Sequence, residues 1–139
     1  MSETYFDMAA TIHQYFGQMS LGNVESVLEL FEEDAVGVYP PMPSIEVEGG
    51  VVSGKDNLRT FYNGLVTKFT SQRAKAGILL GKGLSWATPL HFEGVLAQTG
   101  GVVSFDNINY WEMSERGLIK TLRVYSGGGP TKATFTPRR

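Results

Sequence analysis

The stretch from residue 86 to residue 126, WATPLHFEGVLAQTGGVVSFDNINYWEMSERGLIKTLRVYS, decides the fold. We expect three long strands in it, at Trp86–Gln98, Val102–Met113 and Leu118–Ser126. Turn residues separate these strands, at Thr99–Gly101 and Ser114–Gly117. A fourth strand, Lys75–Leu84, is expected just before them. Strands that are joined by such short turns predict an antiparallel meander.

Helical periodicity dominates most of the chain before about residue 70. Apolar side chains recur every three or four residues, as on one face of a helix, at Tyr5, Met8, Ile12, Tyr15, Phe16 and Met19. Gly22 is expected to end this helix, and Asn23 to cap a second one with the buried residues Val24, Val27, Leu28 and Phe31. A capping-box pattern at Ser53–Asp56 predicts a third helix, whose apolar face carries Leu58, Phe61, Tyr62 and Leu65.

A short strand is expected between the second and third helices, at Asp34–Tyr39. Pro40, Pro41 and Pro43 follow it and end it, because proline lacks the N–H group that a strand ladder needs. Within Ile45–Val52, two glycines separate two β-branched runs, which is typical of a hairpin.

These elements define an α+β architecture, with three N-terminal helices packed on a strongly curved, mainly antiparallel sheet. The curvature predicts a cone with an internal apolar pocket. We expect a single domain over residues 1–139. Residues 128–139 are expected to form a loose tail, because Gly127–Gly129 and Pro130 end the last strand.

Composition excludes several classes of function. Twelve basic and 14 acidic residues give a formal net charge of −2, which predicts no nucleic-acid partner. Without cysteine, disulfides and thiolate chemistry are excluded, and the two histidines, His13 and His91, supply a metal site poorly. No apolar run reaches the roughly 20 residues that a membrane span requires. We therefore expect a cytoplasmic protein without a metal or a membrane partner.

An ordered set of short patterns runs from about residue 12 to residue 126. It consists of Tyr15 seven residues before Gly22, Glu33–Ala35 closing the second helix, Pro40 after the first strand, Gly54–Asp56 opening the third helix, Phe61–Tyr62 inside it, Pro89–Val95, and Glu115–Ile119 in the last turn. In this order the chain resembles ketosteroid isomerase and its superfamily, which includes SnoaL-like polyketide cyclases and limonene epoxide hydrolases.

The resemblance implies a catalytic set. Tyr15 matches the phenol that binds the oxyanion, Tyr62 the phenol that supports it, and Asn109 the second oxyanion donor. Tyr39 stands where the family has its carboxylate base, and a phenol with a reference pKa of about 10 is a poor base. Ordinary ketosteroid isomerisation is therefore not expected. Epoxide hydrolysis requires an Asp–Arg–Asp set that cannot be assembled, because Val124 follows Arg123.

Other residues are candidates for the pocket. Period two places Asn107 and Asn109 on one strand face, and a buried amide there either binds a ligand or bonds to backbone or water. We expect the substrate to contact Met19, Phe61, Phe92, Phe105, Asn107, Trp111 and Leu122. Glu46 and Glu48 could replace the missing base from a covering loop, although solvated loop charges are commoner.

Four further polar side chains have a simpler interpretation. Asp34 is read as a turn residue at the end of a helix. His91 and Glu93 form an acid–base couple or half a metal site, but the resemblance places them on the outer face of the sheet. Arg123 is expected on the same outer face, with Tyr125.

The leading hypothesis is a cofactor-independent isomerase or cyclase that acts on a hydrophobic polyketide-, terpenoid- or steroid-like small molecule. The alternative is a non-catalytic binding domain for an apolar ligand or a protein partner. A weaker option is an interaction scaffold that dimerises through the outer face of the sheet. The resemblance also implies a homodimer.

Overall fold

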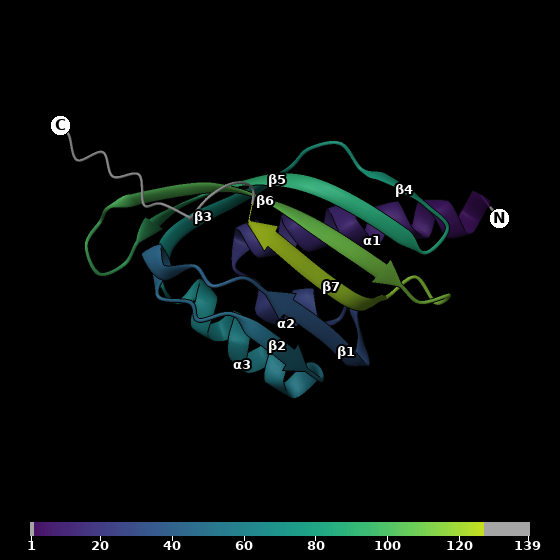
Figure 1. The fold of residues 1–139 in the computed structure, drawn as a ribbon, viewed down its shortest axis with the longest axis horizontal. Helices are drawn as coiled ribbons and strands as arrows, with labels where there is room; N and C mark the ends of the chain where they lie inside the picture. The colour runs from purple at the N-terminus through teal and green to yellow at the C-terminus, as the bar shows by residue number, and fades with distance from the viewer. Residues whose placement is uncertain (1, 127–139) are drawn as a thin grey trace.

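A mixed seven-stranded sheet organises residues 2–126, the part of the chain that the computed structural model describes (Figure 1). Its helices are α1 (Ser2–Leu21), α2 (Val24–Leu28) and α3 (Lys55–Val66), with a 3-10 turn at Pro43–Ile45. Its strands are β1 (Phe31–Tyr39), β2 (Gly50–Ser53), β3 (Phe69–Ala76), β4 (Leu80–Lys82), β5 (Ser85–Leu96), β6 (Val102–Met113) and β7 (Ile119–Ser126). The expected tail at residues 128–139 lies outside the described residues.

The strand order is β2-β1-β7-β6-β5-β3, with β4 paired to β5. The predicted meander is confirmed, because β5, β6 and β7 pair antiparallel with the expected bounds to within two residues. β1 pairs parallel to β7, so the sheet is mixed. The strand path runs from β2 to β3 without joining them, which makes the sheet open rather than a closed cone.

The fourth predicted strand, Lys75–Leu84, is wrong in its bounds. β3 begins at Phe69 and pairs with the second half of β5, from Ala76 opposite Leu90 onward. The ladder is then interrupted at residues 77–79, and β4 resumes it with Leu80 opposite Ala87. One long edge is therefore divided between two shorter strands.

The helices are not all N-terminal, because β1 and β2 precede α3. Glu33–Ala35 lie in β1 and do not close a helix, and Phe31 starts that strand rather than ending α2. Tertiary pairing explains this difference, since the N–H of Ile119 donates to the carbonyl of Leu30 and β7 then continues beside β1. Asp34 is accordingly an exposed strand residue.

Two local predictions around α3 are also wrong. The residue at the N-cap is Gly54, which provides no side-chain hydrogen bond, so Ser53–Asp56 forms no capping box. The hairpin expected at Gly49–Gly50 is replaced by a wider one, in which Gly50 pairs with Tyr39 and residues 40–49 form the connection.

The core is centred on Trp111, which is fully buried on the inner face of β6. Its neighbours across the strands are Trp86 and Leu122. The indole Nε1–H donates to Thr88 Oγ1 at 3.1 Å, and the rings of Tyr15 and Phe16 pack edge-on against the indole. Figure 1 shows α1 lying along the sheet, and these ring contacts hold it there.

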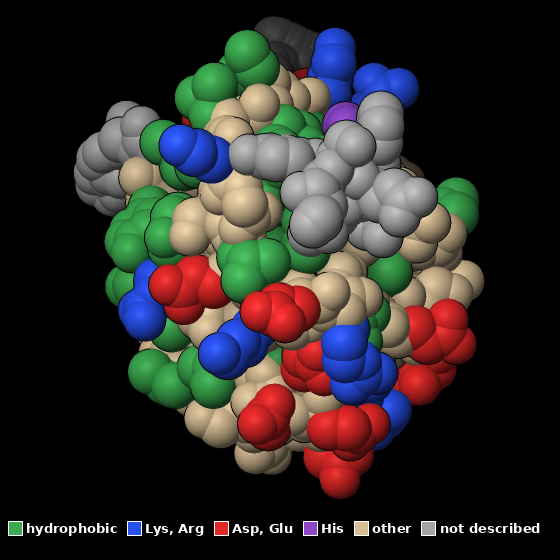
Figure 2. Space-filling view, turned by 90° about the vertical axis from the view of Figure 1, so that its right-hand side faces the viewer, with side chains coloured by type: hydrophobic (Ala, Val, Ile, Leu, Met, Phe, Trp, Pro, Cys, Tyr) green, Lys and Arg blue, Asp and Glu red, His purple; other side chains and the backbone are tan. Residues whose placement is uncertain are grey.

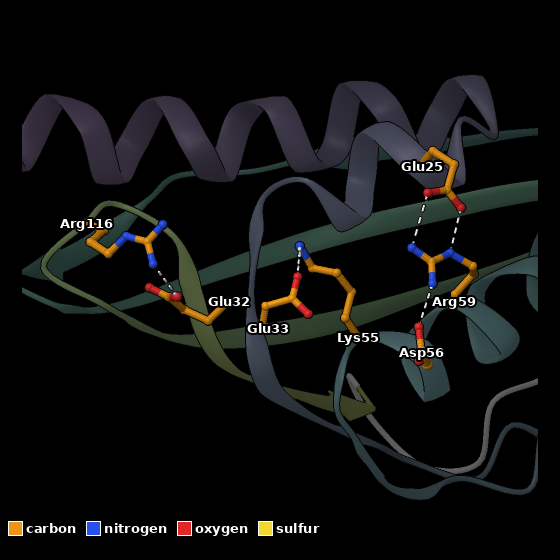
Figure 3. Close-up of polar contacts among 7 residues, drawn as sticks. All are labelled: Glu25, Glu32, Glu33, Lys55, Asp56, Arg59 and Arg116. Carbon is orange, nitrogen blue, oxygen red and sulfur yellow. Dashed lines mark hydrogen bonds and ion pairs between the residues drawn. The ribbon is translucent and has the colours of Figure 1, made fainter.

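Charged side chains of both signs are interspersed on the face shown in Figure 2. Three groups of ion pairs join elements near the helices (Figure 3). Arg59 of α3 reaches Glu25 and Asp56, both at 2.8 Å, Lys55 lies 3.6 Å from Glu33, and Arg116 lies 3.1 Å from Glu32. Exposed pairs of this kind contribute at most about 1 kcal/mol each. Among residues 2–126, no helix is both long and apolar enough to cross a membrane.

Replacing Thr88 with valine tests the Trp111 contact. Thr88→Val keeps the shape of the side chain but leaves the buried indole N–H without its acceptor. We expect the free energy of unfolding to fall by about 1–3 kcal/mol, as measured by chemical denaturation. Thr70→Val, at an exposed position of β3, is the control and should change it by less than about 0.5 kcal/mol. Equal effects of the two substitutions would contradict the prediction.

Candidate functional site

A cavity of about 70 Å³ lies between the inner face of the sheet, α1, α3 and the loop of residues 40–49. Its wall includes nine of the residues expected at the site: Tyr15, Tyr39, Tyr62, Asn109, Met19, Phe61, Phe92, Phe105 and Asn107. Apart from the phenols and amides, the lining is apolar. The cavity is smaller than the roughly 150 Å³ of an engineered protein cavity that binds benzene. A ligand as large as benzene or larger must therefore displace lining side chains.

Three phenols form a hydrogen-bonded chain on one side of the cavity. The hydroxyl of Tyr62, from α3, lies 2.8 Å from the hydroxyl of Tyr15 on α1 and 2.8 Å from that of Tyr39 on β1. The predicted Tyr15–Tyr62 bond is therefore present, and Tyr39 extends it. Two hydrogen bonds use two of the three hydroxyl protons, so one proton remains available to a ligand oxygen.

Burial controls the ionisation of these phenols. It raises the pKa of Tyr15, an effect that the hydrogen bond from Tyr62 offsets in part. Burial also raises the pKa values of Tyr39 and Tyr62 well above their usual range. All three phenols are neutral at physiological pH, so they can donate hydrogen bonds but do not act as bases.

The position of Tyr39 depends on Gly37, two residues earlier on the same strand. The phenol folds back over this glycine, and a Cβ atom at residue 37 would overlap the Tyr39 ring and hydroxyl. The ring also stacks on Phe61, with centroids 4.1 Å apart. Gly37 is thus the residue that lets the Tyr39 hydroxyl reach Tyr62.

Two amides lie on the sheet side of the cavity. Asn107 and Asn109 are 5% and 3% exposed, and both line the cavity from the inner face of β6. The Oδ1 atom of each is buried and has no hydrogen-bond partner within residues 2–126. Thr88 lies opposite Asn109 in the ladder, but its hydroxyl oxygen accepts the Trp111 N–H.

Stacked aromatic rings form the end of the cavity next to these amides. Phe92 and Phe105 face each other across β5 and β6, with centroids 4.9 Å apart and planes 19° from parallel. Phe69 packs edge-on against Phe92 at 5.2 Å. The wall is therefore apolar and aromatic, and suits a ring of the ligand.

Two expected contact residues do not line the cavity. Trp111 and Leu122 have the predicted inward orientation, but both are fully buried in the core. Tyr15 and Phe16 pack against the Trp111 indole and fill the space above it. The cavity therefore stops at Asn109 on β6, one inward residue before Trp111.

The loop of residues 40–49 contributes two lining residues that the sequence analysis missed. Met42 and Ile45 are buried and cover the cavity, and an isolated bridge between Met42 and Val47 closes the loop on itself. Their apolar character within a proline-rich loop was the available signal. Glu46 and Glu48 are exposed and border surface hollows outside the cavity, so neither supplies a base within it.

The remaining charged candidates lie on the outer face of the sheet. His91 Nδ1 is 2.8 Å from Asp106 and Nε2 is 3.2 Å from Glu93, and all three side chains are accessible. The hydrogen bond to Asp106 raises the pKa of His91. In the part of the chain that the structure describes, no group of three or more His, Cys, Asp or Glu side chains is arranged so that it could hold a metal ion. Of the described residues, none that lines the cavity is Asp, Glu, His, Lys or Arg.

Comparisons with known proteins agree with this arrangement. A family model described as a SnoaL-like domain matches residues 12–122. The fold is similar to that of the epoxide hydrolase/cyclase-like enzyme SalBIII, described as acting in pyran ring formation in the polyether salinomycin, with a TM-score of 0.71, 23% identity, and coverage of 86% of this chain and 90% of that one. A search of curated proteins found no match.

Two further solved structures have a similar fold. TerC, co-crystallised with polyporic acid, gives a TM-score of 0.74 at 16% identity, over 86% of this chain and 91% of that chain. The phenazine biosynthesis-related protein PhzB2 of Pseudomonas aeruginosa gives 0.72 at 18% identity, over 88% and 76% of the two chains. At these identities the likeness establishes the fold.

Gly37→Ala tests the close packing of Tyr39. The added methyl group overlaps the phenol, so we expect the free energy of unfolding to fall by about 1–3 kcal/mol in denaturation experiments. Gly17→Ala is the control, because that glycine lies in α1 with open space around it, and it should raise stability by about 0.5–1 kcal/mol. In a Tyr39→Leu background the cost of Gly37→Ala should shrink. If Gly37→Ala lowers the free energy of unfolding equally in both backgrounds, its methyl group does not overlap Tyr39.

Proposed function

Because this chain belongs to the family of SnoaL-like domains, we propose that it is a cofactor-independent isomerase or cyclase. Its proposed substrate is a hydrophobic polyketide-, terpenoid- or steroid-like small molecule. One observation carries the proposal: three hydrogen-bonded phenols share a single spare proton inside a cavity whose lining, apart from two amides, is apolar. Such a donor serves a substrate oxygen on which negative charge develops.

The proposed mechanism is polarisation without a protein base. A carbonyl or ether oxygen of the substrate accepts the free phenol proton of Tyr15, while Tyr39 donates to Tyr62 and Tyr62 donates to Tyr15. A hydrogen bond in this low-dielectric space strengthens as the oxygen gains charge. The proton that leaves carbon must go to another part of the substrate or to water, since no lining residue of the described chain is a carboxylate or histidine.

This limitation decides which reactions are suitable. A substrate that is already activated, such as a poly-carbonyl chain poised to close a ring, needs orientation and one donor more than a strong base. Tyr39 at the position of the family base therefore favours cyclisation over steroid isomerisation. The descriptions of SalBIII, in pyran ring formation, and of TerC, with polyporic acid, support an oxygenated small-molecule substrate.

The second candidate is a non-catalytic binding domain for an apolar ligand or a protein partner. The absence of Asp, Glu, His, Lys and Arg from the described lining favours it. The two functions differ in one measurable respect: an enzyme converts its ligand, whereas a binder releases it unchanged.

Tyr15→Phe distinguishes them. Linear poly-β-ketones, terpenoid epoxides and steroid enones are incubated with the protein, and products are followed by mass spectrometry. For a compound that is converted, Tyr15→Phe should lower kcat by about 10²-fold or more, because an oxyanion donor is lost. Tyr110→Phe, with its phenol outside the cavity, is the control and should leave kcat unchanged. Unchanged turnover in Tyr15→Phe would contradict the mechanism, and binding without conversion would favour the second candidate.

We also propose a homodimer that forms through the outer face of the sheet. Ile108 and Tyr125 are neighbours across β6 and β7, and are 45% and 53% exposed. Burial of such apolar side chains favours association. The charged residues His91, Glu93 and Arg123 lie on the same face and would surround this contact.

Light scattering at micromolar concentration should give about twice the chain mass of 15.2 kDa. Ile108→Asp places a charge in the proposed contact and should shift the mass to that of the monomer. Leu21→Asp is the matched control, since Leu21 is exposed at the end of α1 rather than on the sheet. A monomer at every concentration, or a dimer that tolerates Ile108→Asp, would argue against this interface.

A further inference from the structure

We propose that Asn107 and Asn109 recognise a hydroxyl group of the ligand, so that the cavity takes a hydroxylated aromatic carbonyl compound. This inference rests on the proposed function for the place where the ligand binds, and it names the class of ligand. The ligand must then carry a hydrogen-bond donor for the amides and a hydrogen-bond acceptor for the phenols.

The first step is the state of the two amides. Each presents a buried Oδ1 atom without a partner in the described chain, at the wall of an apolar cavity. A carbonyl oxygen that is buried unpaired destabilises a protein, because it has lost its hydrogen bonds to water. Two such atoms two residues apart on one strand face point to a ligand that supplies the missing donors.

The second step is the chemistry of the group that fits. An amide oxygen accepts a hydrogen bond, so the complementary ligand group carries O–H or N–H. A ligand without a donor at this point would leave both acceptors unpaired, whereas each hydroxyl of a ligand donates one proton and pairs one of them. This difference selects hydroxylated ligands over their deoxy analogues.

The other cavity walls indicate what the rest of the ligand contains. The phenol chain of Tyr15, Tyr62 and Tyr39 offers a proton and therefore binds an acceptor, such as a carbonyl oxygen. The stacked rings of Phe92 and Phe105 provide an apolar aromatic wall beside the amides, which favours an aromatic ring in the ligand. Acceptor, donor and ring together describe a hydroxylated aromatic carbonyl compound.

Four probes of nearly equal size separate these contributions: 4-hydroxyacetophenone, acetophenone, 4-ethylphenol and ethylbenzene. Their affinities are measured by calorimetry on the full chain. We expect 4-hydroxyacetophenone to bind tightest and acetophenone about 3- to 10-fold more weakly, which is the value of one net hydrogen bond. Equal affinities of these two probes, or no detectable binding of either, would overturn the inference.

Leucine substitutions assign the effect to the amides. In the double variant Asn107→Leu/Asn109→Leu the preference for the hydroxyl should disappear, while the preference for the carbonyl remains. Each substitution should also raise the Tm of the ligand-free protein by about 2–8 °C, because a buried unpaired polar group is removed. Asn63→Leu, at an exposed position of α3, is the control and should change neither property. A lower Tm with unchanged probe selectivity would show that the amides are structural, and would overturn the inference.

The outcome is distinguishable from failure of the proposed function. If the hydroxyl preference depends on Asn107 or Asn109 and no compound is converted, recognition by the amides is supported and the proposed enzymatic function is contradicted. If conversion depends on Tyr15 and the amides make no difference to selectivity, the enzyme stands and this inference fails.

Discussion

The Tyr62 hydroxyl is the constraint on which the site depends. It is 1% exposed, and a hydroxyl buried that deeply must find hydrogen-bond partners. Its partners come from α1 and β1, so a single oxygen fixes the relative positions of two helices and a strand. The space between them and the sheet is the cavity. Gly37 takes part in the same constraint, because a larger residue there would push the Tyr39 hydroxyl away from Tyr62.

The two polar sides of the cavity differ in how well they are satisfied. The phenols form hydrogen bonds with one another, whereas the Oδ1 atoms of Asn107 and Asn109 lack partners among the described residues. The protein thus carries a stable donor group beside a pair of acceptors to which a ligand can donate hydrogen bonds. Proteins commonly carry such local destabilisation where they bind or react. Neither side is charged, so recognition depends on hydrogen-bond geometry within an apolar enclosure.

Sequence reasoning predicted the meander well, because strong alternation and turn residues coincide between residues 85 and 126. It also brought Tyr15, Tyr39 and Tyr62 to one region, through a resemblance that orders elements distant in the chain. It failed where tertiary pairing outweighs local pattern: Phe31 pairs with Ile119 of β7, and Glu33–Ala35 lie in β1 instead of extending a helix. It could not separate cavity wall from core, because Trp111 and Asn109 share one face, and the packing of α1 decides where the space ends.

The parallel pairing of β1 with β7 has a consequence for the order of assembly. Val36 lies beside Thr121, about 85 residues later in the chain. During synthesis, β1 therefore cannot pair with β7 until nearly all of the described chain has been made. Contacts this distant in sequence are costly in loop entropy and slow folding. Until β7 has emerged, the edge of β1 that β7 will cover remains unpaired and open to wrong partners.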